Sequence, residues 1–292
     1  MPKIYESKNV LDAAFERLTL IFERFDSVYF AVSGGKDSGV MVQLAEIVAA
    51  RLNRTYDVLY IDFEAQYAHT IDYINRLKTL PHIGRFYHVA LPMALRNAVS
   101  MLQPKWICWD EEARDLWVRP LPEDAITERN NPWPWFRRGE EFEEFIVEFA
   151  RWYHERHPGL VACGVGIRAD ESLNRFQTIA FYERKEEFEG RHWTTKLDEG
   201  LYNFYPIYDW RVEDIWGAVS RLALWRRSAQ RAGSVPRAGA GDVGKGAQPR
   251  QRRELWQYLL PHDGAGQHQV LQAGQHELGG LHGVSAREHR PV

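Results

Sequence analysis

The chain has 292 residues, 45% of them hydrophobic and 13% aromatic, and its formal net charge is -3. This composition argues against a disordered chain, and the charge gives no electrostatic case for nucleic acid as an obligatory partner. The sequence has neither an apolar run of membrane-spanning length nor an N-terminal signal segment, so we expect a cytoplasmic protein that does not contact a membrane. Two cysteines, Cys108 and Cys163, are too few for a disulfide framework, a cysteine-built zinc site or an Fe–S cluster, and buried thiols explain them best.

The first ninety residues alternate between helical and strand-like patterns. Apolar side chains at helical spacing predict helices, and short apolar runs predict strands. In chain order these are a helix over residues 8–25, a strand over 27–32, a helix over 38–52, a strand over 57–63, a helix over 68–80 and a strand over 86–91. This order implies parallel crossovers, and therefore an α/β fold with a doubly wound, mostly parallel sheet and helices on both faces.

The stretch 92–138 is less regular and contains five of the eleven Trp residues. We interpret it as a Trp-rich, helical insertion that covers a site at the edge of the sheet. Beyond it, the same patterns predict a helix over 139–156, a strand over 160–165, a helix over 169–182, a short strand over 204–208 and a helix over 211–222. We therefore expect one domain over residues 1–222.

The composition changes after Leu222. Residues 223–292 lack Phe, Ile, Thr, Asn, Met and Cys, yet they hold eleven of the 22 glycines and ten Lys and Arg against five Asp and Glu. Such a segment cannot easily offset its ordering entropy, so we expect an irregular tail. Two interpretations stay open: a natural basic tail that contacts an acidic partner or nucleic acid, and an out-of-frame translation of a GC-rich gene, which the absence of six residue types favours. Resequencing the coding DNA distinguishes them.

The strongest chemical signal is the loop Ser33-Gly34-Gly35-Lys36-Asp37-Ser38, which lies between the predicted strand 27–32 and the following helix. Its glycines let backbone N–H groups approach an anion, and the helix start adds free N–H groups and the positive end of the helix dipole. The two serines supply hydroxyl groups, and Lys36 supplies a positive charge. Because Asp37 follows the lysine, the loop is not a Walker A sequence. We expect it to bind the phosphates of an adenine nucleotide or a similar oxyanion; the alternative is a tight turn without a ligand.

Four segments, in order, resemble one family. The loop resembles the Ser-Gly-Gly-x-Asp-Ser motif of the PP-loop ATP pyrophosphatase superfamily, and within it the phosphoadenosine phosphosulfate (PAPS) reductase family. Residues 60–64 resemble that family's acidic strand-end motif, residues 166–175 its G-x-R-x-x-E-S-x-x-R segment, and residues 206–216 its closing P-[LI]-x-x-W segment. The likeness covers about residues 15–220, and the Trp-rich insertion is similar to that of the immunoglobulin-binding regulator A-like branch.

The resemblance implies an adenine nucleotide α-hydrolase-like fold, with ATP or PAPS as the ligand and with Mg²⁺. It also implies that Asp37 helps to place the pyrophosphate and its magnesium ion. The expected nucleotide-binding residues are Ser33, Gly34, Gly35, Lys36, Asp37, Ser38, Asp62, Gly166, Arg168, Glu171 and Arg175, of which Lys36, Asp37 and Arg168 are the expected catalytic residues.

The residues themselves support part of this set. Ser33, Asp62 and Gly166 all fall just past predicted strand ends, where ligands of an open parallel sheet bind. Arg168 lies two residues beyond Gly166 and is placed to hold a phosphate or sulfate through two hydrogen bonds.

Each of these side chains has an alternative role. For Arg168 it is a surface ion pair with Asp170 or Glu171. For Asp62, which could position a ribose or a metal ion, the alternative is a capping carboxylate. We expect Glu171 to orient Arg168 or Arg175 rather than to act as a base.

Weaker signals have simpler explanations. The run 110–112 of consecutive acids is typical of a solvated helix start rather than a magnesium site. The aromatic and basic run 133–138 could stack on bases, but a packed lid explains it better. His69, His82 and His88 are isolated and indicate ordinary structural or surface positions, and the five tail histidines lack the spacing of a metal site.

Three functions remain open. The first is adenylyl transfer, in which a substrate oxyanion attacks the α-phosphorus of ATP and pyrophosphate leaves, on an unknown small-molecule or macromolecular acceptor. The second is PAPS reduction, which requires a nucleophilic thiolate; the Glu-Cys-Gly-Leu-His segment of the family reductases is missing here, although an out-of-frame tail would have removed it. The third is a nucleotide-sensing regulator that acts through a protein partner without catalysis.

Overall fold

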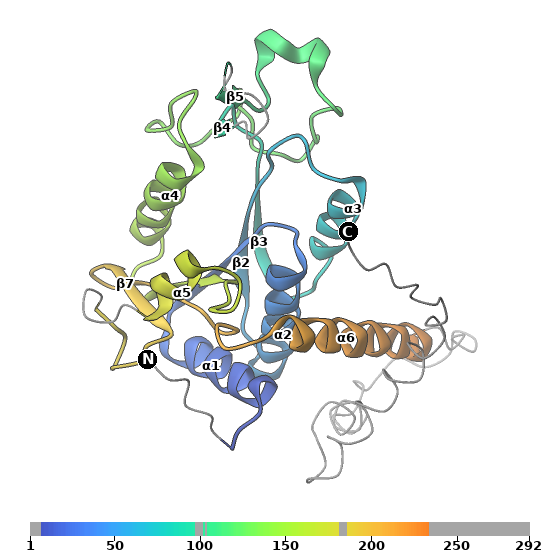
Figure 1. Cartoon of the computed structure of the whole chain (residues 1–292), viewed down its shortest axis with the longest axis vertical. Coiled ribbons are helices and arrows are strands. Elements are labelled where there is room, and N and C mark those ends of the chain that lie inside the picture. The colour runs from blue at the N-terminus through green and yellow to red at the C-terminus, as the bar shows by residue number, and fades with distance from the viewer. Residues whose placement is uncertain (1–6, 97–101, 103, 181–185, 234–292) are drawn as a thin grey trace, which may run out of the picture. The chain divides into compact units, whose positions relative to one another are not determined.

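The computed structural model describes residues 7–96, 102, 104–180 and 186–233. All of them belong to a compact unit of residues 1–234 (Figure 1). The second unit, residues 235–292, lies outside the described residues, and with it most of the predicted tail and its five histidines.

A six-stranded sheet forms the centre of the described unit, and its strand order is β3-β2-β1-β6-β8-β7. The strands β1, β2, β3, β6 and β8 run parallel to one another, and β7 pairs with β8 in the antiparallel direction at one edge. The predicted α/β fold with a mostly parallel sheet is therefore confirmed. The strand bounds are Ser27–Val32 (β1), Tyr56–Ile61 (β2), Ile83–Val89 (β3), Val161–Val165 (β6), Thr194–Asp198 (β7) and Leu201–Phe204 (β8).

Helices cover both faces of this sheet. In Figure 1, α4 lies on one side of β2 and β3, and α3 lies on the other side. Alternate residues of β1 face the two layers: Tyr29 packs against Phe149 of α4, and Phe30 packs against Phe22 of α1. The helix bounds are Val10–Arg24 (α1), Lys36–Leu52 (α2), Ala68–Leu77 (α3), Phe142–Arg156 (α4), Leu173–Ala180 (α5) and Val212–Gly233 (α6).

The order of the strands creates a switch point between β1 and β6. From β1 the chain moves to β2 and β3 on one side, and it later returns to place β6 on the other side of β1. Ala31 of β1 is paired with Val165 of β6, so both strands end at the same level. Open α/β sheets bind their ligands at such a point, outside the carboxyl ends of the strands.

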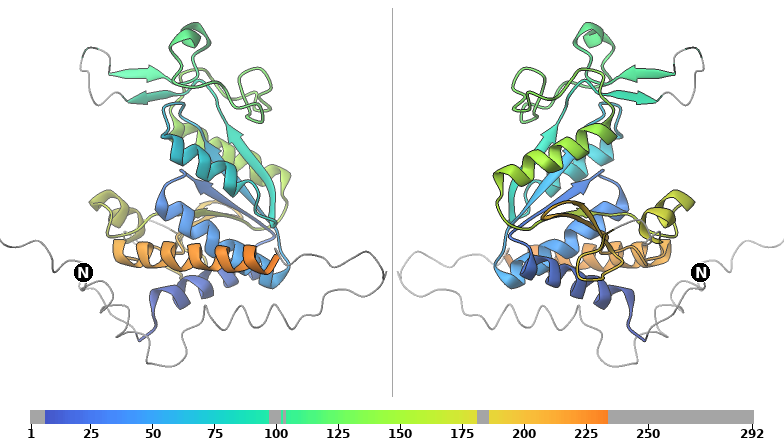
Figure 2. Two further views of the ribbon diagram at one scale, coloured as in Figure 1. Left: turned by 90° about the vertical axis from the view of Figure 1, so that its right-hand side faces the viewer. Right: turned by 90° about the vertical axis from the view of Figure 1, so that its left-hand side faces the viewer.

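The insertion lies beyond the ends of β2 and β3, at the top of Figure 1. Of its described residues, only the short 3₁₀ helix η1, Glu111–Leu116, is helical. Its strands β4, Ala94–Arg96, and β5, Lys105–Ile107, form an antiparallel ribbon that projects sideways in both views of Figure 2. The predicted packed role of the run 133–138 is confirmed for Trp133, which is 1% exposed and lies 5.1 Å from Phe145 between ring centroids. Asp110 caps η1, as a helix-start carboxylate should.

Three predicted elements near the end of the domain differ in their bounds from the observed ones. The predicted strand 204–208 is instead the hairpin β7–β8, which ends at Phe204, and residues 206–209 form turns. The helix predicted over 211–222 continues as α6 to Gly233. The predicted helix 169–182 begins later, at Leu173, and its last two residues lie outside the described part of the chain.

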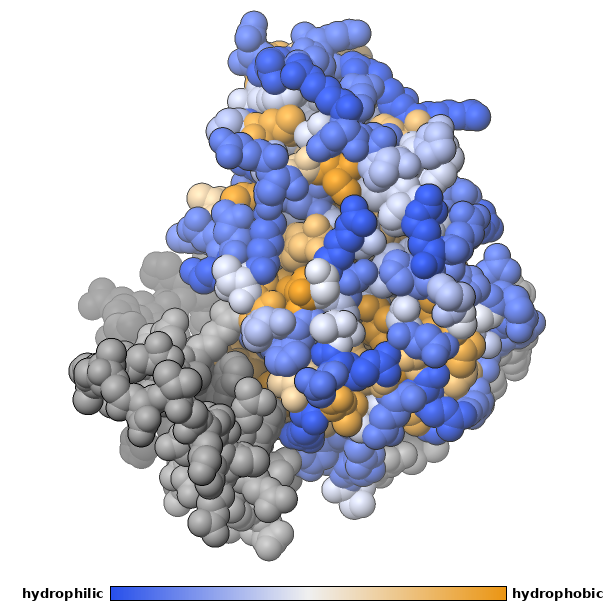
Figure 3. Space-filling model, turned by 180° about the vertical axis from the view of Figure 1, so that it is seen from behind, coloured by the Kyte–Doolittle hydropathy of each residue, from blue (hydrophilic) through white to orange (hydrophobic). Residues whose placement is uncertain are grey.

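The face of the described unit that Figure 3 draws is mainly polar. Figure 3 shows hydrophilic residues over most of one face, with apolar residues in small groups between them. Among the described residues, no helix combines the length and the apolar character that crossing a membrane demands.

Candidate functional site

The loop between β1 and α2 has a conformation that requires glycine. Gly34 has φ +76°, and a Cβ atom there would lie 2.5 Å from Cγ2 of Thr70 in α3. Gly35 is the N-cap of α2 and gives the helix no side-chain cap. Both glycines therefore bring the backbone to the helix start without side-chain atoms in the way.

The helix start carries uncommitted N–H groups. The N–H of Ser33 donates to Oγ of Ser38 over 3.3 Å, and the N–H of Gly35 donates to Oγ of Ser33 over 3.4 Å. In the described part of the chain, no acceptor contacts the N–H groups of Lys36, Asp37 and Ser38. These three donors lie where the dipole of α2 favours an anion.

Two cationic side chains meet at the same place. Nε of Arg168 donates to Oδ1 of Asp37 over 2.7 Å, and Nζ of Lys36 donates to Oδ2 of Asp37 over 2.8 Å. The Arg168 side chain is only 5% exposed and the Asp37 side chain 16%, while Lys36 is more open at 35%. In the part of the chain that the structure describes, Arg168 pairs with Asp37 and makes no ion pair with Asp170 or Glu171.

Gly166 explains how Arg168 reaches the loop. A Cβ atom at Gly166 would lie 2.9 Å from Cα and 3.1 Å from N of Ser38, so the end of β6 touches the backbone at the start of α2. Arg168 lies two residues after Gly166, and its guanidinium donates to the carboxylate of Asp37. The structure thus brings the loop, Gly166 and Arg168 together at the switch point.

Glu171 and Arg175 lie apart from this cluster. Their side chains contact each other at 4.0 Å, and both are about half exposed. Among the described residues, neither side chain contacts the loop 33–38. Glu171 therefore contacts Arg175 and not Arg168, and its orienting role stays a prediction.

Asp62 is fully buried at the end of β2, and protein donors occupy both of its carboxylate oxygens. Oδ1 accepts the N–H of Glu64 at 3.0 Å and also contacts the guanidinium of Arg119, while Oδ2 lies 2.9 Å from Nε2 of His88. Burial raises the pKa of Asp62, but the hydrogen bonds and charges of His88 and Arg119 outweigh burial and hold this pKa below its ordinary value. Asp62 does not cap the helix that follows, because the N-cap of α3 is Tyr67 and has no side-chain cap. Its contacts make His88 part of a hydrogen-bonded network rather than an isolated residue.

Glu64 extends this network into the insertion. It adopts φ +64°, and its carboxylate accepts the N–H groups of Trp109 at 2.7 Å and Val118 at 3.3 Å. The indole of Trp109 donates to the carbonyl of Asp62 over 2.7 Å. We call Asp62, Glu64, Trp109 and Arg119 the carboxylate clip, because they fasten residues 109–119 to the end of β2.

Neither cysteine is placed for chemistry. Both are buried, and burial raises the pKa of each thiol to about 12. Each thiol is therefore protonated at neutral pH. Within the described residues, there is also no group of three His, Cys, Asp or Glu side chains that could hold a metal ion.

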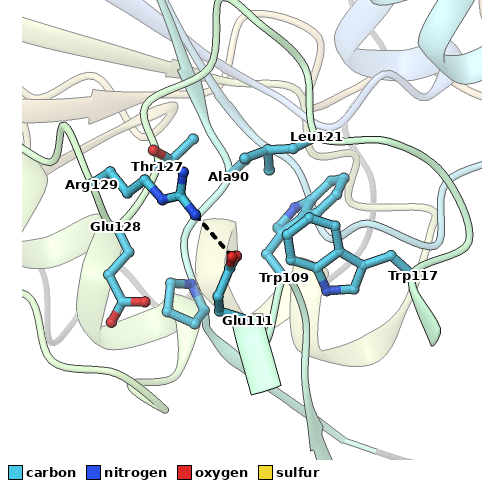
Figure 4. A pocket seen from close by; sticks show the side chains of 9 residues that line it. Ala90, Trp109, Glu111, Trp117, Leu121, Thr127, Glu128 and Arg129 are labelled. Carbon is cyan, nitrogen blue, oxygen red and sulfur yellow. Dashed lines mark hydrogen bonds and ion pairs between the residues drawn. The ribbon is translucent and has the colours of Figure 1, made fainter. Parts of the chain in front are cut away.

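A cavity of about 140 Å³ lies in the insertion, away from the loop. Figure 4 shows Trp109 and Trp117 on one side of it and Arg129 on the other, joined to Glu111. The Arg129–Glu111 pair is 2.9 Å long, and Glu128 lies 3.7 Å from Arg138. All three charged side chains that line the cavity are thus already ion-paired.

Comparison with known proteins gives one curated relative. The uncharacterized protein YbdN of Escherichia coli (strain K12) is 42% identical over 211 residues, which cover 71% of this chain and 51% of YbdN. The chain thus spans about half the length of the curated relative it matches. No family model matches the chain.

Solved structures resemble the chain only distantly. FMN adenylyltransferase of Candida glabrata in complex with ATP is 14% identical, covers 77% of this chain and 62% of its own, and gives a TM-score of 0.37. The U34-tRNA thiolase NcsA of Methanococcus maripaludis with its [4Fe-4S] cluster is 11% identical over 87% of this chain and 76% of its own, also with a TM-score of 0.37. NAD⁺ synthetase of Burkholderia pseudomallei is 12% identical, and the match covers 93% of this chain and 91% of the synthetase, with a TM-score of 0.36. The α/β assignment rests on the strand order above and not on these similarities.

Proposed function

We propose that the chain binds an adenine nucleotide at the switch point between β1 and β6, with its phosphates on the loop 33–38, and transfers the adenylyl group to an acceptor. One observation carries this proposal. Three uncommitted N–H groups at the start of α2 lie beside Lys36 and a nearly buried Arg168. A group of donors and cations at this position in an open α/β sheet is suited to phosphate.

Each residue of the cluster has a role in this proposal. The N–H groups of residues 36–38 hold phosphate oxygens, as helix starts do in other phosphate sites. Arg168 and Lys36 neutralise the phosphate charge once they exchange Asp37 for the nucleotide. Mg²⁺ fits the site with Asp37 as its single protein carboxylate, because magnesium at nucleotides takes one or two carboxylates besides the phosphates and water. The ion would add positive charge to the phosphates.

The proposed reaction requires positioning and charge stabilisation rather than a protein nucleophile. An acceptor oxyanion forms a bond to the α-phosphorus, the bond from that phosphorus to the bridging oxygen breaks, and pyrophosphate leaves with the electron pair. Lys36 and Arg168 offset the charge that develops on the phosphate oxygens. The Gly34–Gly35 backbone keeps this region open to the phosphates.

The buried thiols favour adenylyl transfer over PAPS reduction for this chain. Attack on sulfur requires a thiolate, and both Cys108 and Cys163 are buried with the pKa raised to about 12. A nucleotide-sensing role without catalysis would use the same loop. The release of pyrophosphate from ATP and magnesium by the purified chain separates these two functions, because a sensor would bind ATP and release none.

Calorimetry with ATP and magnesium tests the binding site directly. We expect Lys36→Ala to weaken ATP binding more than tenfold, which corresponds to about 1.4 kcal/mol, because a cation is lost beside the phosphates. Lys8→Ala is the matched control: Lys8 is also a partly exposed lysine paired with a carboxylate, that of Glu16, but it precedes α1. Equal affinities for the chain and for both variants would reject the site.

A further inference from the structure

Asp37 lies where it competes with a bound phosphate. Each of its carboxylate oxygens is held by one cation, Oδ1 by Arg168 at 2.7 Å and Oδ2 by Lys36 at 2.8 Å. Among the described residues, Arg168 has no other ion-pair partner, and its side chain is 5% exposed. Both cations that contact the first turn of α2 at Asp37 are therefore engaged by the chain's own anion.

This arrangement has an electrostatic reason. A guanidinium that is nearly buried without an anion is costly, so an empty phosphate site with Arg168 needs an internal partner. Asp37 is in the first turn of α2, where the helix dipole favours a negative charge. The same field and the same cations favour a phosphate, so the carboxylate and the phosphate exclude each other from one set of partners.

We infer that Asp37 is an internal stand-in for the nucleotide phosphate: it keeps Arg168 and Lys36 paired in the empty site and must give up both cations when a phosphate binds. This inference rests on the proposed function and adds to it how the site is regulated. It makes Asp37 a positioning residue that opposes the binding of metal-free anions. A neutral side chain of the same shape at position 37 should therefore improve such binding.

The test uses inorganic pyrophosphate in the presence of EDTA, with the full chain and calorimetry. We expect Asp37→Asn to bind metal-free pyrophosphate roughly tenfold more tightly than the unsubstituted chain, because the competing carboxylate is gone while both cations stay. If Asp37 is only a structural residue, or only a ligand on the phosphate side of the site, Asp37→Asn should bind metal-free pyrophosphate more weakly than the unsubstituted chain, or equally well. Either result would overturn the inference.

Asp209→Asn is the matched control, since it removes the same charge from another arginine–aspartate pair. Arg17 lies on α1, and its guanidinium contacts the carboxylate of Asp209 at 2.7 Å. Among the described residues, neither of these two side chains contacts the loop 33–38. We expect this variant to leave the pyrophosphate affinity unchanged. An equal gain in both variants would mean that only the net charge of the protein matters, and the inference would fail.

The double variant Asp37→Asn with Arg168→Gln locates the effect. Because Arg168 is the cation released by the first substitution, we expect the double variant to lose the whole gain in affinity. If the gain persists without Arg168, the cation exchange is not its cause.

A second readout covers the case in which Asp37→Asn is poorly folded. A ligand that binds only the native state raises its stability, so pyrophosphate should shift the urea midpoint of Asp37→Asn more than that of the unsubstituted chain. A variant that stays unfolded at saturating pyrophosphate contradicts the inference.

The outcomes also separate the two proposals. If the unsubstituted chain does not bind ATP, the proposed function is rejected. If it binds ATP but Asp37→Asn shows no gain in pyrophosphate affinity, only the stand-in role is rejected.

Discussion

Gly166 is the residue at which β6 touches the loop after β1, and the contact leaves no room for a side chain. A Cβ atom there would lie 2.9 Å from Cα of Ser38, which is backbone and cannot swing away. We expect Gly166→Ala to destabilise the protein by about 1–3 kcal/mol and to weaken ATP binding, because the start of α2 must shift. Urea unfolding and calorimetry measure the two effects.

Gly217 provides the matched control for this substitution. It lies in α6, and a Cβ atom there would meet no atom within 4 Å. Gly217→Ala should stabilise the protein by about 0.4–1 kcal/mol, since alanine loses less conformational freedom in a helix than glycine. If the two variants have the same stability, the close contact at Gly166 is not a constraint.

The two thiols give a second prediction for single residues. Because Cys108 and Cys163 are buried and burial raises the pKa of each to about 12, a thiol reagent should not modify the native chain at pH 7. In urea both should react, which gives two labels per chain. Rapid labelling of a native cysteine, measured by absorbance, would reopen the reductase alternative.

Single residues also mark the limit of what the sequence predicts. The loop 33–38 could be identified because glycines and serines between a strand and a helix form a local pattern. The contact of Asp37 with Arg168 joins residues 131 positions apart, and no periodicity or spacing encodes it. Arg119 was missed for the same reason, since its contacts with Asp62 and Glu64 depend on how the insertion folds back.

At the scale of elements, the carboxylate clip joins β2 to the insertion and should make this join sensitive to acid. The pKa of Asp62 is lower in the folded chain than in an unfolded one, so its stabilising contribution is complete above the unfolded value near 4 and is lost as the pH falls below it. We expect Asp62→Asn to cost about 3 kcal/mol at pH 7 and to flatten the fall in stability between about pH 5 and pH 3. Urea unfolding at several pH values measures this slope.

Asp170→Asn is the control for the clip. Asp170 is exposed and contacts no cation within the described segments. Its substitution should leave both the stability at pH 7 and the slope within experimental error. A slope that Asp62→Asn does not change would mean that the buried carboxylate is not the source of acid sensitivity.

The elements that the sequence predicted well are those with strong local signals. The run 27–32 ends at two glycines, and β1 ends at Val32 as expected. The hairpin β7–β8 was missed although Glu199-Gly200 separates its strands, and Gly200 has φ +74°, a conformation that glycine adopts readily. Because both strands are short and half polar, their own sequence pattern is weak, and the Glu199-Gly200 turn was the stronger indication of a hairpin. The sequence of the ribbon β4–β5 has no such turn pattern, and its Leu95 and Trp106 pack against the core cluster that contains Cys108 and Trp109.

At the scale of the whole molecule, the described unit of residues 1–234 contains the sheet, both helical layers and the candidate site. Residues 235–292 lack the six residue types named above and have few large apolar side chains to bury. These observations predict that the first unit folds and binds ligand by itself.

A chain that stops after Ser234 tests this independence. We expect its free energy of unfolding to lie within about 0.5 kcal/mol of that of the full chain, because a segment with so little apolar surface contributes little burial. Its affinity for ATP with magnesium should be unchanged, since every residue of the switch-point cluster precedes position 169.

The control is a chain that stops after Leu222, within α6, which should be less stable because it removes part of a helix that contacts α2. If the chain ending at Ser234 lost more than about 1 kcal/mol or bound ATP differently, the tail would have to be part of the functional unit, and a natural reading frame through residue 292 would become the better interpretation.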